Sequence, residues 1–151
     1  MLPRWRALLP ALWLGGLLTV ALLATPAPFA TLAKTDAVRV AGRMLAHEAT
    51  ASLLLGALVL LIERLTARRR HAQGQGSEFS LGMLLALGGL ACTVLGYHVI
   101  QPMIVAARQG QGSLGVPALH AISVGLYVVK VALVAALAWR AARDLSPGPS
   151  S

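Results

Sequence analysis

The chain has 151 residues, of which 57% are hydrophobic and only 12% are charged, with a formal net charge of +8 and a mean hydropathy of +0.73. Ordinary globular domains carry about 25% charged residues, so this composition argues against a water-soluble fold. The positive charge does not indicate a nucleic-acid partner, because the basic residues lie beside apolar runs and no aromatic and basic surface accompanies them. We therefore expect a membrane protein whose main partner is the lipid bilayer.

The first two apolar stretches each predict a membrane-spanning helix, since a hydrocarbon core of about 30 Å needs roughly 20 helical residues. Residues 7–33 contain no charged side chain. Basic residues in front of this stretch also fit a secretory signal peptide, but its proline-containing end offers no clean cleavage site, so we expect a retained helix. Residues 44–63 form the second predicted helix, with His47 and Glu48 near its start.

The third and fourth predicted helices follow at residues 79–107 and 114–140. The third is uncharged and contains His98, whereas His120 and Lys130 interrupt the apolar part of the fourth. A closed barrel would need alternating apolar and polar residues, which these stretches lack. The sequence therefore predicts an all-α fold, a polytopic membrane four-helix bundle.

The four helices are expected to form one transmembrane domain of residues 1–145. The remaining residues, 146–151, are only proline, glycine and serine. Such a composition cannot bury apolar surface, so it predicts a disordered tail.

Basic residues on the two sides of the membrane predict the topology. The N-terminus, the second loop and the C-terminus carry Arg4, Arg6, Arg64, Arg68, Arg69, Arg70, Arg140 and Arg143. The opposite side carries Lys34, Arg39, Arg43 and Arg108. Because cytoplasmic loops hold the excess of lysine and arginine, we expect both termini in the cytoplasm and a bacterial inner membrane. The run Arg68, Arg69 and Arg70 is typical of a stop-transfer anchor that also attracts anionic lipid headgroups.

Ionisable side chains inside apolar spans cost a few kcal/mol or more near the bilayer centre, so each needs a reason. In the predicted topology His47, His98 and His120 come from three helices and lie at a similar depth toward the outer face. Imidazoles on facing helices can hold a haem b iron or a copper ion in a bundle core, with Lys130 assisting. The alternative is that these histidines simply bond to backbone and water.

The fourth helix has a polar stripe. His120, Ser123, Tyr127 and Lys130 recur at spacings of three and four residues, which places them on one helical face. The stripe is expected to face the bundle interior and could line a proton or ion path of a small transporter or accessory subunit. Alternatively, Lys130 extends to the inner membrane interface. No catalytic triad, phosphate-binding glycine loop or carboxylate pair is present, which indicates a non-enzymatic protein.

Several short motifs give the chain a family resemblance. They are Leu12-Trp13-Leu14-Gly15-Gly16, Pro26-x-x-Phe29, Ala37-x-x-x-Ala41-Gly42-Arg43, Pro102-Met103-Ile104 and Leu119-His120-Ala121-Ile122-Ser123. From Leu12 to Leu137 the chain resembles the transmembrane protein 205-like family. That resemblance implies a four-helix membrane domain of largely uncharacterised function.

The chain departs from that family's pattern at two places. Leu45-Ala46 stands where an aromatic-proline pair is common, and Tyr127 replaces a polar amide after Ser123. A more distant likeness to copper-resistance D-type and protoporphyrinogen-oxidase-type membrane proteins implies haem or copper roles, although likeness of fold does not establish function.

Overall fold

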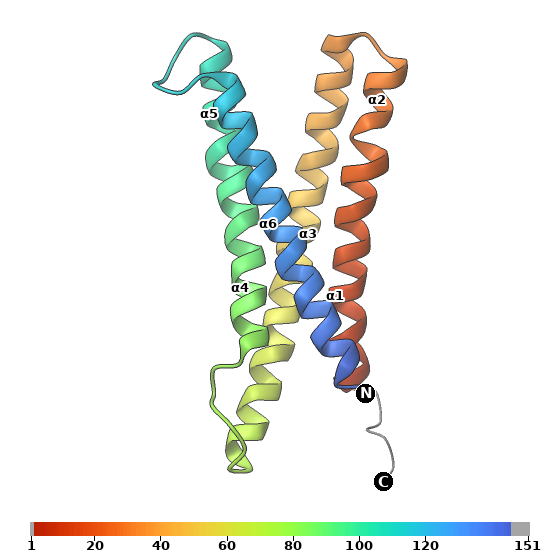
Figure 1. The fold of residues 1–151 in the computed structure, drawn as a ribbon, viewed down its shortest axis with the longest axis vertical. Coiled ribbons are helices and arrows are strands. Elements are labelled where there is room, and N and C mark those ends of the chain that lie inside the picture. The colour runs from red at the N-terminus through yellow and green to blue at the C-terminus, as the bar shows by residue number, and fades with distance from the viewer. Residues whose placement is uncertain (1, 146–151) are drawn as a thin grey trace.

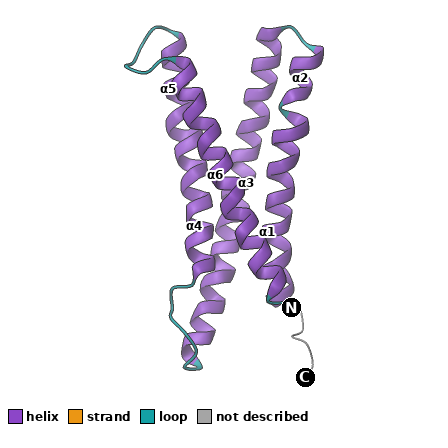
Figure 2. Ribbon diagram, viewed as in Figure 1, coloured by secondary structure: helices purple, strands orange, loops and turns teal. Residues whose placement is uncertain are grey.

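A computed structural model describes residues 2–145, and these residues form helices joined by loops and turns (Figure 2). Four of the helical rods are long and apolar enough to cross a membrane: Arg4–Thr31, Lys34–Ala72, Leu81–Arg108 and Val116–Arg143. They pack together as an all-α bundle, which confirms the predicted fold class. The protein is thus a four-span membrane protein. The tail predicted at 146–151 lies outside the described residues.

Two of the rods contain a π-helical turn. The elements in chain order are α1 (Leu2–Thr19), η1 (Val20–Ala24), α2 (Pro26–Thr31), α3 (Lys34–Ala72), α4 (Leu81–Thr93), η2 (Val94–Ile100), α5 (Gln101–Arg108) and α6 (Val116–Arg143). Each π-helix ends two residues before a proline, Pro26 in one rod and Pro102 in the other. Proline lacks the backbone N–H and clashes with the carbonyl four residues earlier, so a widened turn lets the helix continue through it.

The second rod is longer than its apolar stretch. α3 covers Lys34–Ala72 instead of the predicted 44–63, and its length of about 58 Å far exceeds a hydrocarbon core of about 30 Å. Hydropathy measures transfer into lipid, not helix formation, and no proline interrupts residues 34–43. Asp36 in the first turn and basic residues in the last turn also suit the helix dipole. The other three rods begin and end within a few residues of the predicted helices.

In Figure 1, α6 crosses α3 near the middle of the bundle, and the rod ends that hold α2 and α5 lie apart at the upper end. α1 and α4 each pack against both α3 and α6. Beyond the crossing, α2 contacts α3 and α5 contacts α6, but α2 contacts neither α5 nor α6. We call the lower end, which holds Arg6, Glu63 and Asp144, the base end. The upper end, which holds α2 and α5, is the open end.

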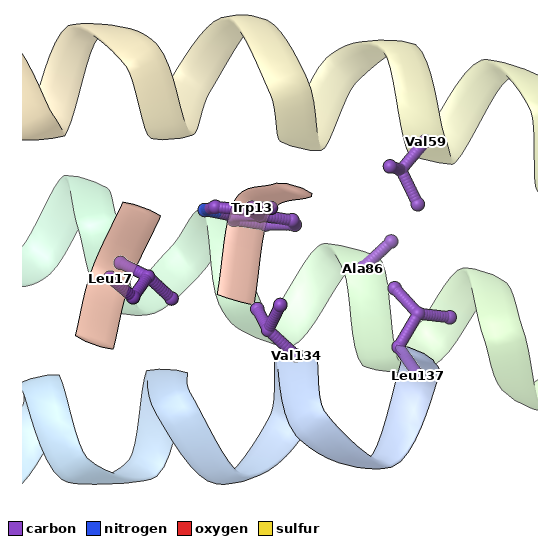
Figure 3. Close-up of a cluster of buried hydrophobic side chains, with 6 residues drawn as sticks. All are labelled: Trp13, Leu17, Val59, Ala86, Val134 and Leu137. Carbon is purple, nitrogen blue, oxygen red and sulfur yellow. The ribbon is translucent and has the colours of Figure 1, made fainter. Parts of the chain in front are cut away.

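The packed half of the bundle has a core centred on an indole ring. Its buried apolar side chains are Trp13, Leu17, Val59, Ala86, Val134 and Leu137 (Figure 3). Gly56 on α3 and Gly89 on α4 make room for the ring, because a Cβ at either position would lie 2.9 Å from a Trp13 ring carbon. Large hydrophobic side chains such as Leu22, Leu23 and Trp139 remain exposed, so the outside of the bundle is suited to lipid contact.

Candidate functional site

A buried ion pair joins the second and fourth rods. Lys130 Nζ on α6 donates to Glu48 Oε1 on α3 at 2.8 Å, and the two side chains are only 4% and 7% exposed. Both residues lie within membrane-spanning helices, where charges are expensive unless paired. Lys130 therefore points to a partner inside the bundle and does not extend to the membrane interface.

Hydrogen bonds tie this pair to the core. Ser52, one turn after Glu48 on α3, donates its hydroxyl to Glu48 Oε1. The indole N–H of Trp13 on α1 donates to Ser52 Oγ at 2.8 Å. A continuous chain from Trp13 through Ser52 and Glu48 to Lys130 thus connects three of the four rods, which fixes the position of the carboxylate.

Tyr127 supports the same site from α6. Its hydroxyl donates to the Leu17 backbone carbonyl at 2.8 Å. The Lys130 ammonium lies 4.6 Å from the centre of the Tyr127 ring, within the range of a cation–π interaction. The lysine consequently has two attractive neighbours, one carboxylate and one aromatic face.

The ion pair borders a small hollow, with a cavity volume of about 40 Å³, on the open-end side of the core. The hollow lies between α3, the η2 region and α6, and its polar lining comes from all three. Besides Glu48 and Lys130, the polar residues that line it are Cys92, Thr93, Tyr97, Gln101, Ser123 and Tyr127. Hydroxyl, amide and charged groups thus converge where the helices begin to diverge. Such a lining can solvate a small ion or a few water molecules.

The three candidate histidines lie elsewhere. His47, His98 and His120 are all exposed on the surface of the bundle, and none lines the hollow. His98 packs its ring against that of Tyr97 edge to face, with 5.2 Å between ring centres. Within residues 2–145 no three His, Cys, Asp or Glu side chains come together as a metal site. Haem or copper binding through these histidines stays a prediction.

The polar stripe of the fourth rod is divided in the structure. Ser123, Tyr127 and Lys130 line the hollow, whereas His120 is exposed. Leu119, the residue before His120, is buried, although the predicted stripe has His120 facing the interior. The stripe therefore describes the interior face of α6 from Ser123 onward.

A second ionic cluster lies at the base end, where it borders two further pockets. Arg6 Nε on α1 lies 2.5 Å from Glu63 Oε1 on α3, and Arg6 NH1 lies 2.6 Å from Asp144 Oδ2 at the end of α6. Ser80, which caps α4 by accepting from the Met83 N–H, donates to Glu63 at 3.5 Å. Glu63 is only 2% exposed. This cluster therefore fastens the ends of all four rods.

Sequence reasoning missed both acidic partners. The sequence pattern shows Glu48 only as an acid near the start of a helix, and Glu63 only as the last residue of a predicted span. The spacing of Glu48 and Ser52 by one helical turn is the local signal that both share an interior face. Nothing local identifies Lys130, 82 residues away, as the partner.

The chain belongs to the DUF4149 family, a domain of unknown function whose model matches residues 8–113. The matched region holds Trp13, Glu48 and Ser52, and it ends before α6, which carries Lys130. Neither a curated protein nor a solved structure matches the chain.

Proposed function

We propose that this DUF4149 protein is a small transporter, or the ion-binding subunit of one, in which Glu48 and Lys130 bind a proton or a small polar ion. The observation that carries the proposal is the buried ion pair at the edge of a polar hollow. Apolar side chains of similar volume often stabilise a fold as well as a buried ion pair does. Charges retained inside a membrane typically mark ion or proton pathways.

The chemistry of the pair suits exchange. A proton arriving at Glu48 would neutralise the carboxylate and remove its attraction for the Lys130 ammonium. An ion with its own positive or negative charge would compete for one partner in the same way. Ser52, which donates to Glu48, keeps the carboxylate in place during the exchange. The pair can therefore open and re-form without moving the backbone of α3.

The arrangement along the bundle supports access from the open end. The hollow and the ion pair lie on one side of the Trp13-centred core, and the base-end cluster lies on the other. Glu48 and Glu63 are separated along α3 by about 22 Å of helix rise. Two polar regions divided by an apolar core match a pathway that is closed toward the base end.

We also propose that the protein lies in a bacterial inner membrane with both termini in the cytoplasm. The support is the excess of arginine in the segments that meet at the base end, since basic residues favour the cytoplasmic side. Arg68, Arg69 and Arg70 would then face the headgroups of the inner leaflet and attract anionic lipids.

We also place the chain among the transmembrane protein 205-like proteins. Support comes from the positions of the motif residues. Trp13 is the centre of the core and donates to Ser52, Leu119 is fully buried, and Ser123 lines the hollow. Three residues of the motifs that carry the resemblance therefore lie in the core or beside the hollow.

Proton flux into proteoliposomes tests the proposed function. The purified protein is reconstituted with a trapped pH-sensitive dye, and a pH gradient is imposed with potassium and valinomycin present. We expect protein-dependent flux that falls at least tenfold in Glu48→Gln and Lys130→Met. The matched controls are Glu78→Gln and Lys34→Met, which remove the same charges from exposed positions.

The outcomes are distinct. Loss of flux in the two site variants alone supports a pathway through the ion pair. Equal flux in all variants contradicts it. If wild-type vesicles show no proton flux, the same vesicles are assayed for uptake of labelled small cations and anions, and absence of uptake for all of them contradicts a transport role.

A further inference from the structure

A groove runs along the outside of the bundle between α3 and α4, near the base end. It has a cavity volume of about 440 Å³ and is separate from the hollow beside Lys130. Its apolar wall includes Leu60 and Leu61 from α3 and Met83, Leu87 and Leu90 from α4. We call it the α3–α4 groove. Because Leu61 and Leu87 are about half exposed, the groove is open sideways to the surrounding lipid.

The charges of the groove are confined to one end. Arg64 and Arg68, one helical turn apart on α3, line that end together with Glu78 and Phe79 of the following loop. Glu78 is already 3.9 Å from the His71 ring nitrogen. The two guanidinium groups give this end a positive charge, and guanidinium pairs bind phosphate oxygens well.

The length of the groove matches one leaflet. From Ala57, at its apolar end, to Arg68 the rise along α3 is about 16 Å. Half of a hydrocarbon core of about 30 Å is about 15 Å. A molecule with its charged part at Arg64 and Arg68 would therefore extend its apolar part to the middle of the bilayer. Phe79, which is 77% exposed beside the arginines, is placed like an aromatic anchor at the interface.

We propose that the α3–α4 groove is a binding site for one anionic phospholipid. The phosphate lies between Arg64 and Arg68, and an acyl chain runs along Leu61, Leu87 and Leu90. This site is distinct from a general attraction of headgroups to the arginine run, because it combines a charged end with an apolar channel of matching length. It does not depend on the proposed transport function.

Native mass spectrometry of the protein released from nanodiscs tests the site. The nanodiscs contain equal amounts of phosphatidylglycerol, phosphatidylethanolamine and phosphatidylcholine. We expect one phosphatidylglycerol to remain bound to the wild-type protein after most lipid has been removed. In Arg64→Gln/Arg68→Gln the bound fraction should fall at least fivefold.

A matched control removes the same charge elsewhere on the base end. Arg140→Gln/Arg143→Gln changes two exposed arginines on α6 that do not line the groove, and it should retain phosphatidylglycerol at the wild-type level. A third variant, Leu61→Trp, fills the apolar channel and leaves both arginines in place, so it should also lose the lipid.

Equal loss of lipid in the two arginine double variants would overturn the proposal, because it would indicate a diffuse charge effect. Equal retention of phosphatidylglycerol and phosphatidylcholine by the wild type would do the same. Circular dichroism of each variant confirms that it is folded before lipid is measured.

Discussion

Within residues 2–145 two ionic clusters join the rods, one partly buried at the base end and one buried inside the bundle. At the base end, Arg6 has two acidic partners, and the helices around it are packed together. In the middle of the bundle, Glu48 and Lys130 have each other and lie against a hollow. Both clusters neutralise charges that lipid could not solvate. Pockets border both clusters, but those at the base end are lined partly by residues outside the helices, such as Gln75, Ser77 and Asp144, whereas the hollow beside Glu48 and Lys130 is lined by helix residues alone. We therefore assign structure to the first cluster and propose function for the second.

The largest effect is expected from breaking the base-end cluster. Glu63→Ala leaves Arg6 buried without its principal partner and also removes the acceptor of the Ser80 hydroxyl. Removing one member of a buried ion pair costs about 3–5 kcal/mol. We therefore expect the free energy of unfolding of the detergent-solubilised protein to decrease by that amount. Denaturant titration followed by circular dichroism measures it.

The control for this variant is Glu78→Ala, an acid on the exposed loop. It should change the free energy of unfolding by less than about 0.5 kcal/mol. Similar destabilisation by both variants would contradict the fastening role of Glu63.

The next largest effect is expected from an alanine substitution in the packed half, at Gly89, compared with the same substitution beside the hollow, at Gly96. In Gly89→Ala the new Cβ would lie 2.9 Å from the Trp13 ring, so the core must shift. Overpacking costs about 1–3 kcal/mol. Gly96 lines the hollow, and a Cβ there has no atom within 4 Å, so Gly96→Ala should be neutral or slightly stabilising.

Thermal unfolding in detergent measures this difference, with Trp fluorescence as a second readout. Destabilisation of similar size in both glycine variants would mean that the hollow is as tightly packed as the core. That result would remove the basis for distinguishing the two halves of the bundle.

Sequence patterns predicted the rods far better than their contacts. Each span contains a long apolar stretch with few ionisable side chains, and hydropathy locates such stretches well. The 3.6-residue period also placed Ser123, Tyr127 and Lys130 on one face of α6. His98 lies inside η2, where the wider π turn breaks that period, so its face could not be read from spacing.

The partners of the buried charges depend on how the rods cross. Glu48 meets Lys130 because α3 runs diagonally past α6, and Arg6 meets Asp144 because α1 begins and α6 ends at the base end (Figure 1). The two pairs are separated by 82 and 138 residues in sequence. No local pattern encodes such crossings, because they depend on contacts between distant rods, such as the packing of Trp13 against Gly56 and Gly89.

A smaller effect on stability is expected when Glu48 and Lys130 are replaced together. Glu48→Leu/Lys130→Met removes both charges together, and such replacements are often neutral or stabilising. Stability should therefore change by less than about 1 kcal/mol, while proton flux in the vesicle assay is lost. The single variant Lys130→Met, which leaves Glu48 unpaired, should be less stable than the double variant.

Retention of flux in a stable double variant would contradict a functional role for the pair. A large loss of stability in the double variant would instead show that the pair fastens the bundle as Glu63 does. The double variant thus shows whether Glu48 and Lys130 serve the flux or fasten the bundle.

The smallest effect is expected from the three histidines. His47, His98 and His120 are exposed and none lines the hollow, so the triple replacement by alanine should change stability by about 0.5 kcal/mol or less per site. Flux through the Glu48–Lys130 site should stay at the wild-type level. A visible absorption spectrum of protein expressed with ample haem, before and after dithionite, is the decisive measurement. A Soret band that disappears in the triple variant would establish that these histidines bind haem. Because they are exposed, the haem would then lie on the outer surface of the bundle or between two copies of the protein.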